Sequence, residues 1–309
     1  MTRPLPRARG AALAGGVLLA LTLTAACTPA GADDDGVEVL ASFYPLEYVA
    51  ERVGGEHVAV SNLTPPAAEP HDLELSPAQV RQIGSSDLVV YLSGMQPSTD
   101  EAVAARDPEN VLDTAEAAGL EAGPNGSAAP APEGSVLDPH FWLDPTRLAT
   151  VGHQVAEELS AIDPDHADDY AANAQALEDD LVVLDEEYAT GLAACAGATL
   201  VVSHAAFGYL AERYDLVQVG ISGIDPEAEP SPARLREVRG VVEDAGVETL
   251  FFEVLVSPKV TRTLADDLGV GTDMLDPLEG HTDEEADYLA AMRANLDALR
   301  QGLVCEAAG

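Results

Sequence analysis

Short apolar runs alternate with helical patterns along most of the chain. Three such runs lie in the first hundred residues, and four more follow residue 198, with helical stretches between them. This alternation is typical of βαβ units, in which parallel strands pack against helices. It predicts an α/β fold with two lobes, each a parallel sheet flanked by helices. The expected strands are residues 37–42, 57–63, 87–92, 199–202, 216–219, 248–252 and 270–275, and the clearest early helices are 45–53 and 77–84.

One long amphipathic pattern joins the two lobes. Asp163 can cap a helix, Pro164 suits its first position, and no Pro or Gly follows until Gly191. A helix over residues 164–195 would be about 48 Å long, so we expect lobes that tilt slightly instead of closing widely. Its predicted buried stripe, at spacings of three and four, is Tyr170, Ala174, Leu177, Leu181, Leu184, Tyr188 and Leu192.

The predicted domain organisation follows from these patterns. We place the N-terminal lobe at residues 37–150, the helical connection at 151–196 and the C-terminal lobe at 197–309. Residues 119–137 are rich in Gly, Ala and Pro and lack strand or helix periodicity, which predicts a mobile loop on the first lobe.

Residues 1–26 have the pattern of a signal peptide. Three arginines precede an apolar run at 10–26, which is too short and too rich in small residues to favour a transmembrane helix. The run ends in Thr24-Ala25-Ala26-Cys27, which resembles the lipobox of bacterial lipoproteins, although Thr24 stands where Leu is usual. Cys27 would then carry a lipid, and the polar segment 27–36 would be its tether. The alternative is an ordinary secretory signal with an incidental cysteine.

The chain is strongly acidic. Its 54 acidic and 15 basic residues give a formal net charge of −39, and loss of the three early arginines would leave 12 bases and a charge of −42. Such a surface repels phosphate backbones and anionic lipid, which argues against a nucleic-acid partner, and it tolerates cations. With 47% hydrophobic and 22% charged residues, a wholly disordered chain is excluded.

Export of the protein would affect whether the two remaining cysteines form a disulfide. An oxidising compartment favours pairing Cys195 with Cys305. A bridge that closes a loop of this length would stabilise the fold by roughly 4–5 kcal/mol in the chain-entropy description. It would also fix the C-terminus to the start of the second lobe. The alternative is a pair of unbridged, buried thiols.

Four polar residues lie at or near the expected ends of strands, or in turn-rich loops. His71 follows the second strand, His140 lies in an Asp- and Pro-rich loop, His204 follows strand 199–202, and Asp276 follows the last strand. Open α/β sheets bind ligands beyond the carboxyl ends of their strands. Two of these residues come from each lobe, so together they could form a metal site of three imidazoles and one carboxylate in the interlobe cleft. Taken singly, each histidine is more often structural, and no compact C-x-x-C or H-x-x-x-H motif occurs.

The segments around these residues form recognisable motifs, which are Glu69-Pro70-His71-Asp72, Asp138-Pro139-His140-Phe141-Trp142-Leu143-Asp144-Pro145, Val202-Ser203-His204-Ala205-Ala206-Phe207-Gly208-Tyr209-Leu210 and Leu275-Asp276-Pro277-Leu278. They resemble the metal-ligand segments of the zinc- and manganese-uptake solute-binding proteins of bacterial ABC transporters (ZnuA-like, cluster A-I). The likeness spans roughly residues 37–305. Further matches are Phe43-Tyr44-Pro45-Leu46, Phe252-Glu253 and Ser257-Pro258-Lys259. The resemblance implies two lobes joined by one rigid helix, with His71, His140, His204 and Asp276 binding one metal ion.

The choice of metal follows from the ligand types. Three neutral imidazoles and one carboxylate form a borderline-soft tetrahedral set that suits Zn²⁺. Manganese members of the family usually have a carboxylate where His204 stands. Mn²⁺ stays possible, because a bidentate Asp276 or a water molecule could enlarge the coordination sphere.

Three further acids and one histidine lie close to the predicted ligands in the sequence. Pro70 stands where some members of the family have a glutamate, so Glu69 is left out of the ligand set. Asp72 and Asp144 could orient ligand imidazoles. His281 could lie near the site. Residues 119–137 contain no histidine, which argues against the auxiliary metal-binding loop of many zinc-uptake members.

The resemblance implies an extracytoplasmic solute-binding protein that is anchored as a lipoprotein to the outer face of the cell membrane. It would bind Zn²⁺ between the lobes and deliver the ion to the membrane permease of an ABC transporter. We expect a monomer without enzymatic activity, because four protein ligands close the coordination sphere. Three alternatives remain: a manganese-specific member of the family, a zinc hydrolase with Glu253 as general base, and a surface adhesin. The adhesin would need an exposed apolar patch, for which 5% aromatic residues offer little.

Overall fold

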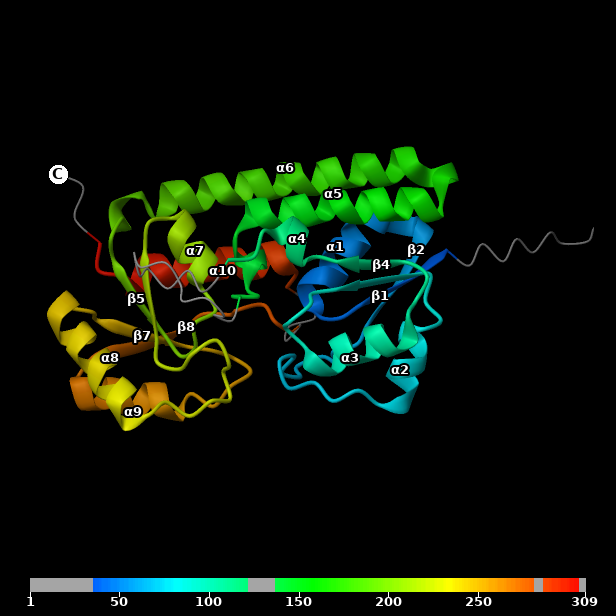
Figure 1. Ribbon diagram of the computed structural model, residues 1–309. Coiled ribbons are helices and arrows are strands. Elements are labelled where there is room, and N and C mark those ends of the chain that lie inside the picture. Colours follow the sequence, from blue (N-terminus) through cyan, green and yellow to red (C-terminus); the bar gives the residue numbers. More distant parts are fainter. Residues whose placement is uncertain (1–35, 122–136, 281–285, 306–309) are drawn as a thin grey trace, which may run out of the picture. The chain divides into compact units, whose positions relative to one another are not determined.

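The computed structural model describes residues 36–121, 137–280 and 286–305, and it confirms two α/β lobes (Figure 1). Each lobe contains a four-stranded sheet in which every neighbouring pair of strands is parallel. The sheet of the N-terminal lobe has the order β2-β1-β3-β4, and that of the C-terminal lobe has the order β6-β5-β7-β8. The strands are β1 (Val37–Ala41), β2 (Val58–Asn62), β3 (Leu88–Tyr91), β4 (Val111–Asp113), β5 (Thr199–Val202), β6 (Val217–Gly220), β7 (Thr249–Phe252) and β8 (Gly271–Met274).

Helices follow most of the strands, as the sequence pattern predicts. None of those in the described chain has the length and apolar composition that crossing a membrane requires. The predicted signal peptide, Cys27, its tether, His281 and most of the predicted loop at 119–137 lie outside the described residues. The helices are α1 (Tyr44–Gly54), α2 (Pro77–Ile83), α3 (Pro97–Arg106), α4 (Ala115–Ala118), α5 (Pro145–Ile162), α6 (Ala167–Gly191), α7 (Gly208–Arg213), α8 (Pro232–Ala245), α9 (Lys259–Leu268) and α10 (Tyr288–Gly302).

The central strands β1, β3, β5 and β7 carry buried side chains on both faces of their sheets, which is typical of parallel strands covered by helices. Successive side chains of a strand point to opposite faces. In β5, Val202 packs into the large core that also contains the stripe of α6, whereas Val201 packs into a separate cluster with residues of α8 and α9. In β1, Val39 joins the large core and Leu40 a cluster with residues of α2 and α3. One core is therefore common to both lobes, and each lobe has a second core on its other face.

The connection between the lobes is a pair of helices. The predicted stripe of α6 is buried along its whole length, which confirms the amphipathic pattern. The helix itself is shorter than predicted: a 3-10 turn occupies Pro164–His166, so α6 begins at Ala167 and is about 38 Å long. Helix α5 packs along it (Figure 1). Pro164 has no N–H to donate, which favours the break between the two helices.

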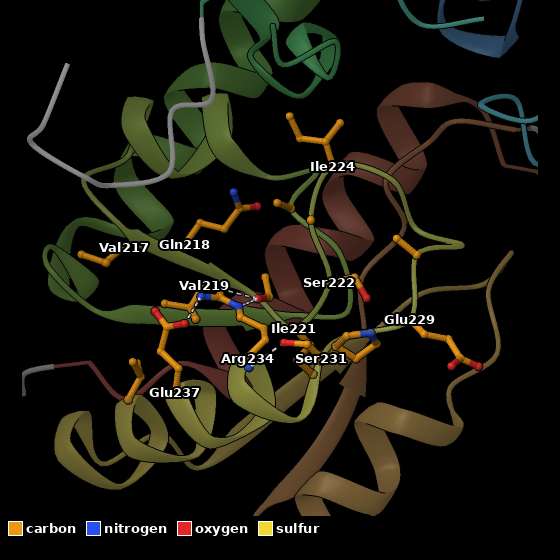
Figure 2. Close-up of a pocket in the computed structure, with 16 residues that line it drawn as sticks. Val217, Gln218, Val219, Ile221, Ser222, Ile224, Glu229, Ser231, Arg234 and Glu237 are labelled. Carbon is orange, nitrogen blue, oxygen red and sulfur yellow. Dashed lines mark hydrogen bonds and ion pairs between the residues drawn. The ribbon is translucent and has the colours of Figure 1, made fainter. Parts of the chain in front are cut away.

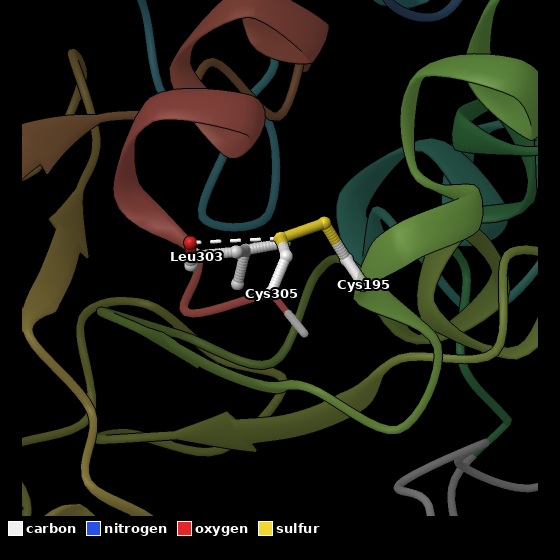
Figure 3. Close-up of a disulfide and its surroundings, with 3 residues drawn as sticks. All are labelled: Cys195, Leu303 and Cys305. Carbon is white, nitrogen blue, oxygen red and sulfur yellow. Dashed lines mark hydrogen bonds between the residues drawn. A yellow bond between two sulfur atoms is a disulfide. The ribbon is translucent and has the colours of Figure 1, made fainter. Parts of the chain in front are cut away.

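A disulfide and an ion pair join the C-terminal part of the helical connection to the C-terminal lobe. Cys195 and Cys305 form a disulfide, as predicted, with Cα atoms 4.2 Å apart (Figure 3). In addition, the Arg213 guanidinium donates to both carboxylate oxygens of Asp185 in α6, at 2.6 and 2.7 Å. Arg213 also lies 3.4 Å from Asp144, which caps α5 by accepting the N–H of Thr146.

The disulfide gives a first prediction. Replacing both Cys195 and Cys305 by serine should lower the free energy of unfolding by roughly 4–5 kcal/mol, because the unfolded chain regains the entropy of an open loop of 110 residues. Urea unfolding followed by circular dichroism, with and without reductant, measures the difference. Reductant should destabilise the natural chain to the same extent and leave the double variant unchanged; equal stability with and without the bridge would contradict the prediction.

The Arg213–Asp185 pair predicts a pH dependence of stability. Hydrogen bonds from Arg213 hold the pKa of the Asp185 carboxyl below its usual range. A carboxyl with a lowered folded-state pKa stabilises the protein fully above its unfolded-state pKa of about 3.9, and this stabilisation is lost as the pH falls through the folded-state value. Asp185→Asn should therefore lower the free energy of unfolding by about 1 kcal/mol at neutral pH, and the difference should shrink below about pH 4. Urea unfolding at several pH values tests this, with the same substitution at the exposed Asp297, Asp297→Asn, as the control.

Candidate metal centre

Four polar side chains converge where strands of both lobes end. His71 follows β2, His140 directly precedes the 3-10 turn Phe141–Leu143, His204 follows β5, and Glu279 follows β8. Each offers one ligand atom, and these four atoms all lie within 4.8 Å of one another. Three of the four side chains are at most 1% exposed; that of His71 is 11% exposed. The structure therefore brings the three predicted histidines together with one carboxylate.

The spacing of the four ligand atoms matches a tetrahedral zinc ion. With metal–ligand bonds of 2.0–2.1 Å, the corners of a tetrahedron lie about 3.3 Å apart. The Nε2 atom of His140 is 3.4 Å from that of His71 and 3.3 Å from that of His204. The Glu279 Oε1 atom lies 2.9, 3.1 and 3.5 Å from the Nε2 atoms of His140, His204 and His71, respectively. Five of the six distances between the ligand atoms are therefore close to the edge of a zinc tetrahedron, and all four atoms lie within 4.8 Å of one another.

Two buried acids orient the imidazoles. The Nδ1 of His140 lies 2.7 Å from Asp138 Oδ1, and the Nδ1 of His204 lies 2.5 Å from Glu253 Oε2. Ser203 Oγ also donates to Glu253. A carboxylate that accepts from Nδ1–H leaves the lone pair of Nε2 free for a metal, and such partners typically fix the ring of a ligating histidine. Asp138 and Glu253 therefore set both the tautomer and the direction of two ligands.

The contacts between acids and imidazoles shift the pKa values of both kinds of side chain. Burial would lower the pKa of His140, but Asp138 and Glu279 outweigh it and raise the pKa of that imidazole. The pKa of His204 is raised well above its usual value against the same effect of burial, by Glu253 and Glu279. Burial would raise the pKa of Glu279, but His204 and His140 hold it well below the usual range. The environment favours positive charge among the imidazoles, which a divalent cation would supply.

The fourth predicted ligand, Asp276, is not part of the cluster, whose carboxylate is Glu279. Asp276 is held by the turn it begins, since its Oδ1 accepts the N–H of Leu278 at 2.8 Å. Its backbone N–H and C=O also bond the side chain of Asn295, in α10. Leu278 adopts a positive φ of 59°, a sharp turn that brings Glu279 to the histidines. Trp142, beside the His140 loop, donates its indole N–H to the carbonyl of Pro277 and holds this turn in place.

The other acids near the site have separate roles. Glu69 accepts the backbone N–H of His71 at 3.0 Å, and burial together with nearby Glu279 raises the pKa of Glu69 to about 8. Glu69 is not among the four residues of the cluster. Asp144 caps α5 instead of orienting an imidazole. The acids that do orient imidazoles are Asp138, two residues before His140, and Glu253.

Comparisons with known proteins agree with this site. The ZnuA family profile, described as "Zinc-uptake complex component A periplasmic", matches residues 39–302. The zinc-binding lipoprotein AdcA of Streptococcus pneumoniae serotype 4 is 34% identical over 296 residues, which cover 92% of this chain and 59% of AdcA. The chain thus spans about three-fifths of that relative. The high-affinity zinc uptake system protein ZnuA of Bacillus subtilis is 31% identical over 304 residues, covering 91% of this chain and 94% of its own.

Solved structures give the same result. The Zn(II)-bound ZnuA-like domain of S. pneumoniae AdcA has a TM-score of 0.71 and 33% identity, over 86% of this chain and 98% of that domain. The laminin-binding protein Lmb of Streptococcus agalactiae, described as bifunctional with adhesin and metal transporting activity, has a TM-score of 0.75 and 33% identity, over 86% of this chain and 99% of that protein. With the family profile matched over nearly the whole described chain, this protein belongs to the ZnuA family of zinc-uptake components.

Proposed function

We propose that this protein is the extracytoplasmic solute-binding component of a zinc-uptake ABC transporter. It binds one Zn²⁺ as cargo through His71, His140, His204 and Glu279 and delivers the ion to a membrane permease. The observation that carries the proposal is the agreement between the spacing of the four ligand atoms and the edge of a zinc tetrahedron. Its family and its zinc-binding relatives support the same function.

Zinc is favoured over manganese by the donor set. Three of the four donors are imidazole nitrogens, whereas Mn²⁺ prefers oxygen ligands and a larger coordination number. The only carboxylate in the cluster, Glu279, places a single oxygen atom, Oε1, within 3.5 Å of all three histidine Nε2 atoms. The partly exposed ring of His71 marks the side from which the ion enters and leaves.

The same donor set argues against an enzyme. A catalytic zinc keeps one coordination position open for water and needs a nearby general base. Here four protein ligands close a tetrahedral sphere, and Glu253, the one candidate base, is engaged with His204 and Ser203. We therefore propose a binding protein without hydrolase activity.

An adhesin function has less support, although the Lmb relative is described in part as an adhesin. Adhesion through an apolar surface needs a contiguous exposed patch. In the part of the chain that the structure describes, the large hydrophobic side chains that are exposed include no aromatic one. The proposal also places the protein as a monomer on the outer face of the cell membrane, attached through a lipid on Cys27 by way of the lipobox-like sequence.

Zinc titration of the metal-free protein tests the proposal and the corrected ligand together. The natural chain should bind one zinc ion, and Glu279→Gln should weaken binding by more than the roughly 10–100-fold typical of outer-sphere changes, because it removes a charged ligand. Asp276→Asn is the matched control and should leave affinity nearly unchanged. Competition with a zinc-chelating dye gives the dissociation constants. An Asp276 variant that loses zinc while the Glu279 variant retains it would reverse the assignment, and a natural chain that binds no zinc would end the proposal.

The role of Glu253 gives a separate prediction. Glu253→Gln removes the charge that orients His204 and should weaken zinc binding about 10–100-fold with the stoichiometry unchanged. The exposed residue Glu248, in the same lobe, supplies the control Glu248→Gln, which should bind as the natural chain does. Affinity is read from the same competition assay and folding from circular dichroism. If a folded Glu253→Gln protein keeps full affinity, Glu253 does not position the ligand.

A further inference from the structure

Two hollows of the C-terminal lobe are lined by residues of α8, away from the metal centre. The first, of about 620 Å³, follows the edge of β6 and the start of α8 (Figure 2). Its one cation, Arg234, donates to the carbonyl of Gly220 and forms an ion pair with Glu237 at 3.0 Å. Because this charge is already neutralised and bonded, the hollow offers nothing that would select a ligand.

The second hollow is a groove of about 470 Å³ between α8 and α9. We call it the α8–α9 groove. Its floor is apolar, formed by Leu235, Val260 and Leu264. Val260 is 39% exposed, one of the few large hydrophobic side chains that the described chain leaves open to water. Its charged lining residues are the basic Arg236, Arg239 and Lys259 and the acidic Glu229 and Asp267.

Such a concentration of cations is unusual for this protein. Only 12 basic residues follow Cys27 in a chain of net charge −39, and Lys259 is its single lysine. Three of these 12 line one groove. Arg239 forms an ion pair with Asp267 at 3.5 Å, whereas in the described part of the chain the side chains of Arg236 and Lys259 form none. Free cations flanking an apolar floor form an electrostatic and hydrophobic complement to an acidic segment with an apolar side chain.

We propose that the α8–α9 groove is a docking surface for an acidic segment of a partner protein, which places an aliphatic or aromatic side chain on Val260 between carboxylates that pair with Arg236 and Lys259. Charge complementarity across an interface fixes register and speeds encounter. An anionic membrane is the weaker fit, since the whole chain is repelled by such a surface and the Debye length of about 8 Å confines the attraction of three cations to close contact. A single segment that enters the groove can reach Arg236 and Lys259 directly, and its carboxylates must avoid Glu229 and Asp267.

The groove is separate from the metal centre. Its helices cover the face of the C-terminal sheet that carries Val201 and Leu250, whereas the core shared with α6 lies on the other face. A partner can therefore bind without contacting a metal ligand. The inference does not depend on zinc binding, and the two can fail independently.

A displayed library of random peptides tests the docking surface on the full mature chain. Peptides are selected on the natural protein and counted against a double variant, Arg236→Glu with Lys259→Glu. The matched control carries the same change of charge at two exposed arginines of the other lobe, Arg81→Glu with Arg106→Glu. We expect enrichment of peptides in which Asp or Glu flanks an apolar residue, with binding to the control retained.

The most enriched peptide is then synthesised and its affinity measured. It should bind the Arg236/Lys259 variant at least about tenfold more weakly than the natural chain and the control, and Val260→Ser should weaken it as well. Zinc affinity should be the same in all variants. The proposal is overturned by the absence of enrichment, by enrichment of neutral or basic peptides, by equal binding to both double variants, or by phosphatidylglycerol vesicles binding through these residues when no peptide does.

Discussion

The burial of Glu279 beside three histidines is the constraint on which the rest of the site depends. A carboxylate that leaves water loses several kcal/mol of hydration unless close partners replace it. Here the partners are three imidazole nitrogens at 2.9–3.5 Å, contributed by loops of both lobes. Asp138 behind His140 and Glu253 behind His204, together with Glu279 itself, raise the pKa of these two imidazoles and favour positive charge on them. The centre is thus a buried network of acids and imidazoles that requires positive charge, carried either by protons or by a divalent ion.

The four side chains keep their spacing only if the two lobes stay fixed relative to each other. The helical connection between the lobes holds them in this way. The stripe of α6 belongs to a single core that also contains residues of β1, β5 and β7. Buried hydrogen bonds cross between the lobes close to the site: Tyr288 donates to the carbonyl of Trp142, and Tyr209 donates to that of Asp138. Bending the connection would expose apolar surface and break these bonds. Small tilts therefore fit the architecture better than wide closure, and the least constrained ligand is the partly exposed His71.

The alternation of elements and the three histidines could be predicted from sequence because both follow from local pattern. All seven expected strands were placed within one residue at either end, and each histidine lies in a loop beyond a strand or at its end. Strand β4 was missed, since three residues with one buried side chain give no periodicity. Asp276 was predicted because it follows the last strand and lies in a motif that resembles the family's, and Glu279 was not considered. The turn that brings Glu279 to the histidines depends on a positive φ at Leu278, and the sequence pattern does not indicate such a backbone conformation.

The acidic surface and the metal centre contribute to selectivity in different ways. A net charge of −39 attracts every divalent cation, including Ca²⁺ and Mg²⁺, and at physiological salt this attraction extends only about 8 Å. It raises the local concentration of cations but does not distinguish among them. Discrimination must come from the buried donors, because hard cations such as Ca²⁺ and Mg²⁺ require oxygen ligands in larger number. Three nitrogens and one oxygen at tetrahedral spacing meet the preference of zinc and of few other abundant ions, so the selectivity of this protein depends on the four residues it buries and not on the many acids it exposes.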